Sequence, residues 1–281
     1  RMNAFINALP FSLTGAQKNV YNEMKRDMES GRVMNRLVQG DVGSGKTVVA
    51  ALALYKAVLS GYQGALMVPT EILAVQHYIT MSKLFEGFDV NVALLTGSKT
   101  AKEKRETIEK LKNGEINILI GTHALLEDKV EFKSLGLVIT DEQHRFGVRQ
   151  RAVLSKKGND PDVLVMTATP IPRTLALILY GDLDISIINE LPPGRKPVKT
   201  YAVDNSMRQR IYDFIRKKVK EGRQVYMVCP LVEESEDISA KAASELAEKL
   251  SQNDFKDMRV GLVHGKMKPK DKEAVMDSFV K

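Results

Sequence analysis

Residues 138–147, VITDEQHRFG, hold the side chains best suited to chemistry: Asp141, Glu142 and His144 follow directly after an apolar run. Three kinds of site fit these residue types. They are a metal cage of acidic residues and histidine, a hydrolase centre of paired carboxylates, and the acidic part of a nucleoside-triphosphatase. The choice among them depends on what the rest of the chain supplies.

The segment GDVGSGKT at residues 40–47 matches the phosphate-binding pattern G-x-x-x-x-G-K-[ST]. An apolar run precedes it and VVAALALYKAVL follows with helical period, which is the strand–loop–helix context that the pattern requires. In such a loop, backbone N–H groups and the helix N-terminus surround phosphate oxygens, Lys46 reaches the β and γ phosphates, and Thr47 can ligate Mg²⁺. The residues predicted to bind the triphosphate are Gly40, Asp41, Val42, Gly43, Ser44, Gly45, Lys46 and Thr47.

A phosphate loop needs an acidic partner at the end of a neighbouring strand, and Asp141 supplies it. We expect Asp141 to hold Mg²⁺ and Glu142 to orient or deprotonate the attacking water. A metal cage with His144 as a ligand is less favoured, because the spacing is not H-E-x-x-H and no Cys or His pair lies nearby in the sequence. A carboxylate pair is also less favoured, since adjacent strand residues point to opposite faces. The pattern therefore favours a triphosphatase.

The composition is that of a basic protein large enough for two domains. The 281 residues carry 42 Lys and Arg against 35 Asp and Glu, a net charge of +7, which is compatible with a polyanionic partner. The single cysteine, Cys229, lies in the apolar stretch VYMVCP, where we expect a buried residue in a reducing compartment. Apolar runs stay below the roughly 18 residues that a membrane helix needs. We expect a soluble, cytoplasmic protein without a membrane partner.

Apolar, β-branched runs alternate with stretches of helical period in the first two thirds of the chain. The expected helices include 46–60, 70–86 and 100–113, and the expected strands are RLVQG, GALMVP, VNVALLTG, INILIGT, LGLVITD, DVLVMTAT and LDISIIN. Strands separated by helices imply right-handed crossovers and a parallel sheet covered on both faces. The predicted fold class is α/β.

The proline-rich residues 192–198 indicate a linker, after which the alternation resumes. We expect helices near 206–221 and 239–251 and from 269, with strands at 224–230 and 259–265. Two strands are too few to close a sheet, so the sequence predicts an incomplete second domain.

Further segments stand in the order of the superfamily-two helicase motifs around the phosphate loop: FSLTGAQ, VPTEILAVQHY, LLTGS, IGTHALL, DEQH and MTATPIPRTLAL. The strings DEQHRFGVRQR, YGDLDIS and ELPPGRKPV make the chain resemble the branched-DNA translocases of this superfamily, from about Leu9 to Lys281. The resemblance implies a RecA-like P-loop NTPase domain over 1–191, a linker over 192–198 and part of a second RecA-like domain over 199–281. It also implies ATP and Mg²⁺ as cofactors, branched or forked DNA as the partner, and a monomer.

The resemblance assigns roles to single residues. It implies that Gln17 recognises adenine, that Gln143 and His144 sense the γ-phosphate, and that Thr167 and Thr169 couple the phosphate site to DNA movement. The residues it implies as DNA contacts are Thr70, Gln76, Thr96, Gly97, Thr122, His123, His264 and Gly265. Hydroxyl, amide and backbone donors at strand ends suit contacts with phosphates, which position a strand without reading its sequence.

The resemblance implies ATP-driven fork regression and branch migration in recombination and repair. Thr140 and Asn189 depart from the family pattern without removing a catalytic group. The chain ends before the arginine-bearing helix that completes the ATP site in similar helicases, so we expect ATP binding with little turnover from these residues alone. The alternatives are a transcription-repair coupling or restriction translocase, a nucleotide-dependent DNA-binding module without turnover, and a small-molecule P-loop kinase.

Overall fold

The computed structural model describes residues 1–141, 153–169, 183–190, 198–229 and 236–280. The chain divides into two compact units, Arg1–Lys196 and Pro197–Lys281. The predicted linker 192–198 lies outside the described residues except for Val198, as do Glu142, Gln143 and His144.

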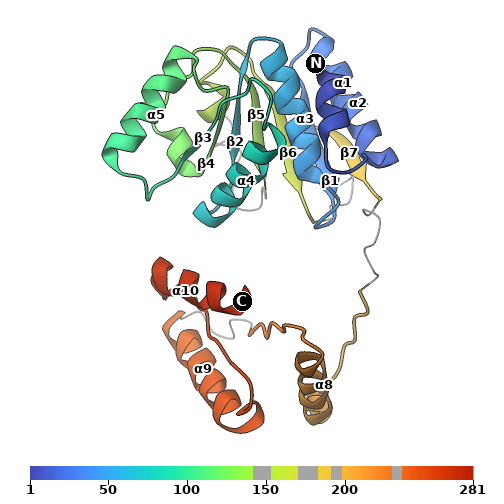
Figure 1. The fold of residues 1–281 in the computed structure, drawn as a ribbon, viewed down its shortest axis with the longest axis vertical. Helices are drawn as coiled ribbons and strands as arrows, with labels where there is room; N and C mark the ends of the chain where they lie inside the picture. The colour runs from blue at the N-terminus through green and yellow to red at the C-terminus, as the bar shows by residue number, and fades with distance from the viewer. Residues whose placement is uncertain (142–152, 170–182, 191–197, 230–235, 281) are drawn as a thin grey trace. The chain divides into compact units, whose positions relative to one another are not determined.

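The first unit is built on a seven-stranded sheet with the order β3-β4-β2-β5-β6-β1-β7, in which every pair of neighbours is parallel (Figure 1). Because all strands run the same way, their carboxyl ends meet at one edge of the sheet. The seven predicted strands and the parallel sheet are confirmed. The strands are β1 (Asn35–Gly40), β2 (Gln63–Met67), β3 (Val92–Leu95), β4 (Ile118–Gly121), β5 (Leu135–Asp141), β6 (Asp162–Thr167) and β7 (Asp184–Ile188).

Helices cover both faces of this sheet, as predicted. Along a strand, alternate side chains enter different cores. Leu66 and Ile139 pack in a core that includes residues of four helices, α1 (Met2–Ala8), α2 (Gly15–Glu29), α3 (Lys46–Leu59) and α4 (Glu71–Leu84). Met67 and Val138 pack in a second core with α5 (Ala101–Asn113) and the 3-10 turn η1 (His123–Leu126). The central helix α3 is apolar around most of its surface, because it packs against helices as well as strands.

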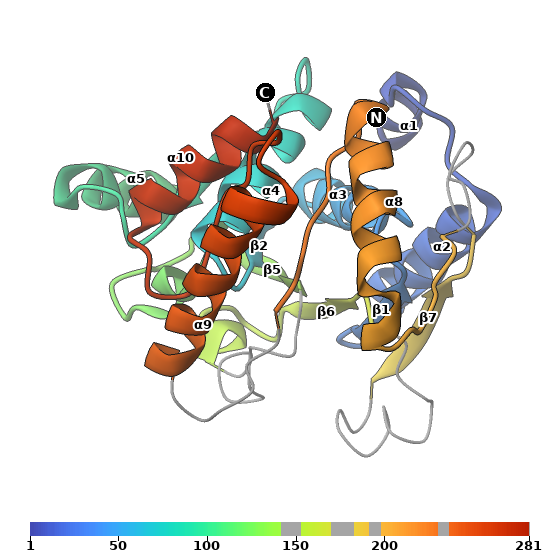
Figure 2. The same ribbon diagram turned by 90° about the horizontal axis from the view of Figure 1, so that it is seen from below.

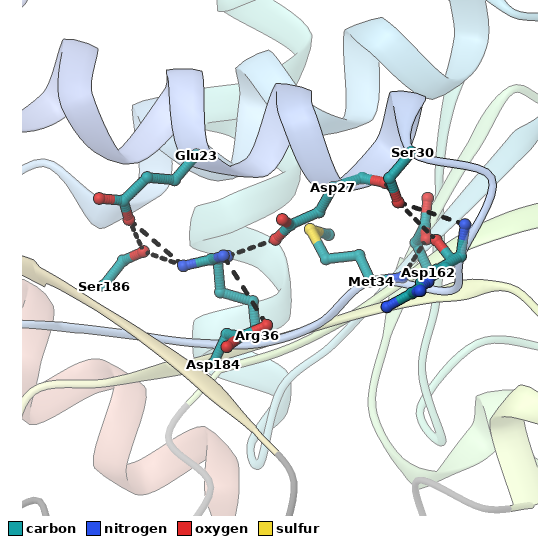
Figure 3. A network of polar contacts seen from close by, with 9 residues as sticks. Glu23, Asp27, Ser30, Met34, Arg36, Asp162, Asp184 and Ser186 are labelled. Atoms are coloured by element: carbon teal, nitrogen blue, oxygen red, sulfur yellow. Dashed lines mark hydrogen bonds and ion pairs between the residues drawn. The ribbon is translucent and has the colours of Figure 1, made fainter.

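A buried arginine fastens α2 to the edge of the sheet (Figure 3). Arg36, at the start of β1, is 8% exposed, and its Nε donates to Asp27 Oδ2 at 2.6 Å. Its Nη1 lies 3.3 Å from Glu23 Oε2 and donates to Ser186 Oγ of β7 at 2.8 Å. Figure 3 shows α2, β1 and β7 meeting at this guanidinium. The network therefore sets the position of α2, whose N-terminus reaches the phosphate loop.

Replacing Arg36 with Met should destabilise the first unit by about 2–3 kcal/mol. Removing one partner of a fully buried ion pair costs roughly 3–5 kcal/mol, and the carboxylates of Glu23 and Asp27, 36% and 26% exposed, recover part of that from water. The matched control is Lys112→Met, which breaks an exposed pair with Glu131 and should cost less than about 1 kcal/mol. Urea unfolding followed by circular dichroism compares the two, and equal losses would contradict the role of the buried network.

The second unit is helical in its described parts, with α8 (Arg208–Lys220), α9 (Glu236–Lys249) and α10 (Pro269–Val280) close to the predicted helices. Short helical segments, η3 (Asn205–Met207) and the π-helical η4 (Leu250–Asp254), accompany them. A small core forms where Tyr212 and Leu250 pack around Phe255. Figure 2 shows α8, α9 and α10 from below.

The predicted strands at 224–230 and 259–265 are wrong for the residues that the structure describes, since neither segment pairs into a ladder. A parallel strand is held by hydrogen bonds from its neighbours, and apolar sequence alone does not supply them. Tyr226 and Val228 are accordingly 70% and 85% exposed. The expectation that Cys229 is buried is wrong for the same reason, because its side chain is exposed.

Candidate nucleotide and nucleic-acid site

The phosphate loop joins the end of β1 to the first turn of α3. Its backbone reverses through Gly43 and Gly45, whose φ angles of 78° and 88° are costly for other residues. Gly45 is the N-cap of α3 and has no side chain to accept from the N–H groups of the first turn. Lys46 Nζ donates to the carbonyl oxygens of Gly40 at 2.6 Å and Asp41 at 3.1 Å. Helix N–H groups and an ammonium therefore gather at one loop, as phosphate binding requires.

The space inside the loop also requires glycine. A Cβ on Gly40 would lie 2.5 Å from Ser44 Oγ, and one on Gly45 would lie 2.2 Å from Gln17 Nε2. Ser44 Oγ is buried and has no hydrogen-bond partner among the described residues, so the loop keeps a polar atom to satisfy. Thr47, the predicted Mg²⁺ ligand, follows Lys46 in the first turn of α3. The donor set and the close-packed glycines fit a bound triphosphate.

Gln17 holds the N-terminus of α2 against this loop. Its Oε1 accepts from the Thr14 N–H at 2.9 Å in a capping box, and its Nε2 donates to the Ser44 carbonyl at 2.9 Å. The side chain is 4% exposed. From the chain after β7, Glu190 Oε2 accepts from the Ala16 N–H at 3.1 Å. Gln17, the residue predicted to recognise adenine, therefore also connects the phosphate loop to α2. The N-terminus of α2 is capped by Thr14 and by Glu190.

Thr167 ends β6, the strand beside β1, and Asp141 ends β5, the strand on the other side of β6. Asp141 is the last residue of β5 and pairs in register with Met166 of β6, while Thr167 pairs with Gln39, just before Gly40. Thr169 N donates to Thr167 Oγ1 at 3.2 Å, and the two hydroxyls lie 2.9 Å apart. The ends of β5, β6 and β1 thus bring Asp141, Thr167, Thr169 and the loop to one place, which we call the nucleotide edge.

One residue at the nucleotide edge was missed by the sequence reasoning. His77, on α4, is 8% exposed, and its Nε2 lies 2.9 Å from Asp141 Oδ2. The sequence did contain a signal, because His77 lies in an otherwise apolar helical stretch one position after the predicted DNA contact Gln76. No spacing rule ties a helix residue to an aspartate 64 positions later.

Most of the predicted DNA contacts of the first unit follow strands β2, β3 and β4. Thr70 caps α4 after β2, Thr96 and Gly97 follow β3, and Thr122 and His123 follow β4. Since β3, β4 and β2 are neighbours in a parallel sheet, these residues lie at the same carboxyl edge of the sheet as the phosphate loop. We call the part of this edge after β2, β3 and β4 the strand-contact edge. Gln76 is exposed on α4. His264 and Gly265 lie in the second unit, where Lys272 Nζ donates to the Gly265 carbonyl at 2.9 Å.

In the described part of the chain, no group of three His, Cys, Asp or Glu side chains is placed to hold a metal ion. No helix of that same part is long and apolar enough to cross a membrane.

The fold and the nucleotide edge define a P-loop nucleotide-binding protein of the RecA-like architecture. Residues 14–178 match the family described as DEAD/DEAH box helicase, and the chain belongs to this family. It is 57% identical to the ATP-dependent DNA helicase RecG of Bacillus subtilis over 275 residues, which are 98% of this chain and 40% of that protein. RecG of Thermotoga maritima is 51% identical over 98% of the chain and 35% of its own length.

A solved structure of RecG bound to a three-way DNA junction matches 99% of this chain and 36% of its own, with 47% identity and a TM-score of 0.81. The predicted resemblance to superfamily-two translocases and the RecA-like fold class are confirmed by these matches. The chain spans about two fifths or less of the length of these relatives.

Proposed function

We propose that this chain is part of an ATP-dependent DNA translocase of RecG type, which acts on branched DNA in fork regression and Holliday-junction branch migration. The observation that carries the proposal is that the phosphate loop, Asp141 and the chain segments after β2, β3 and β4 all lie along the carboxyl edge of one parallel sheet. The identity to RecG helicases and the junction-bound relative support it. The protein would work in the cytoplasm, as a monomer, in recombination and repair.

In this function, Lys46 and the N–H groups of the loop bind the phosphates of ATP, and Thr47 and Asp141 hold Mg²⁺. Bound Mg²⁺ supplies charge stabilisation to the phosphate oxygens. Glu142 orients the attacking water and accepts its proton, so the product is inorganic phosphate. Asp141 ends the buried strand β5, with only β6 between β5 and β1, and Glu142 follows it in the sequence, which supports these roles.

Coupling would run through Thr167 and Thr169 of the nucleotide edge and through residues that follow Asp141 in the sequence. We propose that Gln143 and His144 sense the γ-phosphate and that Thr167 and Thr169 pass its state to the DNA. The described contact between the hydroxyls of Thr167 and Thr169, one strand away from the loop, supports the second role. The two RecA-like domains would comprise residues 1–191 and 199–281, joined by 192–198.

The strand-contact edge would hold DNA through its backbone. Thr70, Thr96 and Thr122 offer hydroxyl groups, and among these four residues only Gln76 carries the amide donor and acceptor pair that can read a base edge. Binding should therefore be largely independent of sequence. It should also weaken steeply as salt rises, because the Lys and Arg residues of this basic chain would neutralise phosphates. His264 and Gly265 of the second unit would add to the same contact.

The 281 residues alone should bind Mg²⁺-ATP and hydrolyse it slowly. Positive charge supplied opposite a phosphate loop accelerates phosphoryl transfer by roughly 10³–10⁵, and the chain represents about two fifths or less of its relatives. A labelled three-way junction provides the test in the intact protein. Strand dissociation should need hydrolysable ATP, whereas dissociation with a non-hydrolysable analogue would favour a binding module without turnover. Equal action on plain duplex would favour the repair-coupling class.

Gln17 should set the preference for adenine. Gln17→Ala should lower ATP affinity by about 10-fold and make ATP and GTP bind alike, because the amide that would read adenine is lost together with one hydrogen bond to the loop. Gln17→Glu keeps the oxygen that caps α2, but it loses the Nε2 donor to Ser44 and places a carboxylate oxygen against that carbonyl. Equilibrium titration with both nucleotides compares the variants. Retained ATP preference in Gln17→Ala would remove the residue from this role.

A further inference from the structure

We propose that His77 is a positioning residue that orients the carboxylate of Asp141 and links it to the strand-contact edge through α4. The inference rests on the proposed function, because it concerns how Mg²⁺-ATP binding and DNA contact depend on each other. It assigns a role to a side chain outside the phosphate loop and outside the residues 141–144.

His77 and Asp141 are in direct contact. His77 Nε2 and Asp141 Oδ2 lie 2.9 Å apart, and the two side chains are 9% and 13% exposed. An ionised carboxylate can only accept, so Nε2 carries the hydrogen and donates it. A hydrogen bond from a buried neighbour fixes the rotamer of a metal-holding carboxylate, and losing such a bond typically costs 10–100-fold in metal affinity or activity. His77 thus determines how Asp141 presents its oxygens.

The helix that carries His77, α4, is also bonded to the strand-contact edge. α4 begins directly after β2, and its N-cap Thr70 accepts from the Leu73 N–H at 3.3 Å. In the first turn, Glu71 Oε1 accepts from the Ser98 N–H at 2.9 Å. Ser98 follows Thr96 and Gly97, so this bond ties the chain after β3 to α4. Two loops of the strand-contact edge are therefore attached to the helix that holds Asp141.

The orientation of α4 exposes one of two adjacent side chains and buries the other. Its residues Gln76 and His77 are adjacent, yet Gln76 is exposed and His77 is buried against β5. A DNA backbone held by Thr70 and Gln76 would fix α4, and α4 would fix His77 and Asp141. By linkage, the reverse also holds, so Mg²⁺-ATP at the nucleotide edge would strengthen the grip on DNA.

The proposal predicts a change in how ATP binding depends on Mg²⁺. A fluorescent ATP analogue is titrated onto the 281-residue chain in EDTA and at rising Mg²⁺ concentrations. His77→Phe retains an aromatic ring without a donor and should need 10–100-fold more Mg²⁺ for the half-maximal gain in affinity, with binding in EDTA unchanged. His77→Gln can place an amide near the position of Nε2 and should restore Mg²⁺ dependence to within a few-fold. Ile79→Ala, exposed on the same helix, is the matched control and should behave as wild type.

A wild-type Mg²⁺ dependence in a folded His77→Phe chain would overturn the proposal. If this variant does not fold, His77→Asn replaces it, because its shorter amide stays polar but cannot reach Asp141 as glutamine does, and equal Mg²⁺ dependence in the Gln and Asn variants then overturns it. In the intact protein, the Phe variant should also lose most of the stimulation of kcat by junction DNA, and Mg²⁺-ATP should no longer strengthen its binding of DNA. Absence of any Mg²⁺-dependent ATP binding by the wild type would instead contradict the proposed function.

Discussion

Replacing Glu142 with Gln in the intact protein should slow ATP hydrolysis by about 10²–10⁴-fold, the usual contribution of a general base, and leave Mg²⁺-ATP bound. Glutamine matches the shape of the side chain but cannot take the proton of the attacking water. Asp141, which ends β5 next to the nucleotide edge, stays in place to hold the metal. Single-turnover hydrolysis and equilibrium ATP binding are the two measurements.

The contrast comes from Lys46→Ala, which removes the ammonium at the loop. This variant should weaken triphosphate binding itself. The pair of variants therefore separates binding from chemistry. Near-normal turnover by Glu142→Gln would show that another group activates the water.

The Gly45→Ala chain should lose about 10–100-fold in ATP affinity and at least the roughly 1–2 kcal/mol in stability that its left-handed φ costs. A left-handed φ costs a residue with a Cβ roughly 1–2 kcal/mol, and the φ of Gly45 is 88°. The new Cβ would also stand 2.2 Å from Gln17 Nε2. Gln17 would have to leave the Ser44 carbonyl, and a lost hydrogen bond of a buried group costs about 1–3 kcal/mol. The substitution should therefore distort the phosphate loop and displace Gln17, the residue proposed to contact adenine.

The matched control for Gly45→Ala is Gly61→Ala. Gly61 has a similar φ of 85°, and no described atom lies within 4 Å of its ideal Cβ. It should show the loss of stability without the loss of affinity, measured by thermal unfolding and by titration with ATP. Equal ATP affinities in the two variants would mean that the contact of Gly45 with Gln17 has no part in binding.

The first unit could be predicted closely from the sequence because its strands are short apolar runs between turn residues. The predicted strand LGLVITD, for example, has the same bounds as β5. A strand buried on both faces is apolar along nearly its whole length, and this pattern is visible in the sequence. The phosphate loop could be predicted equally well, because its glycines allow a local backbone conformation with positive φ angles.

Contacts between distant segments were not predictable in the same way. The bonds of Arg36 to Ser186, Ala16 to Glu190 and His77 to Asp141 join residues 150, 174 and 64 positions apart. Each bond depends on which strands and helices the fold brings side by side, and no local sequence pattern shows this. The strands predicted at 224–230 and 259–265 failed for the converse reason, since their apolar residues found no ladder among the described residues.

The measurement that tests the central claim most directly is the steady-state ATPase rate of the intact protein with no DNA, with duplex, and with a three-way junction. A RecG-type translocase should hydrolyse ATP slowly without DNA, faster with duplex and fastest with the junction, and Lys46→Ala should abolish all three rates. A rate unaffected by any DNA, or one raised as much by plain duplex as by the junction, would contradict the proposal that the nucleotide edge serves movement on branched DNA.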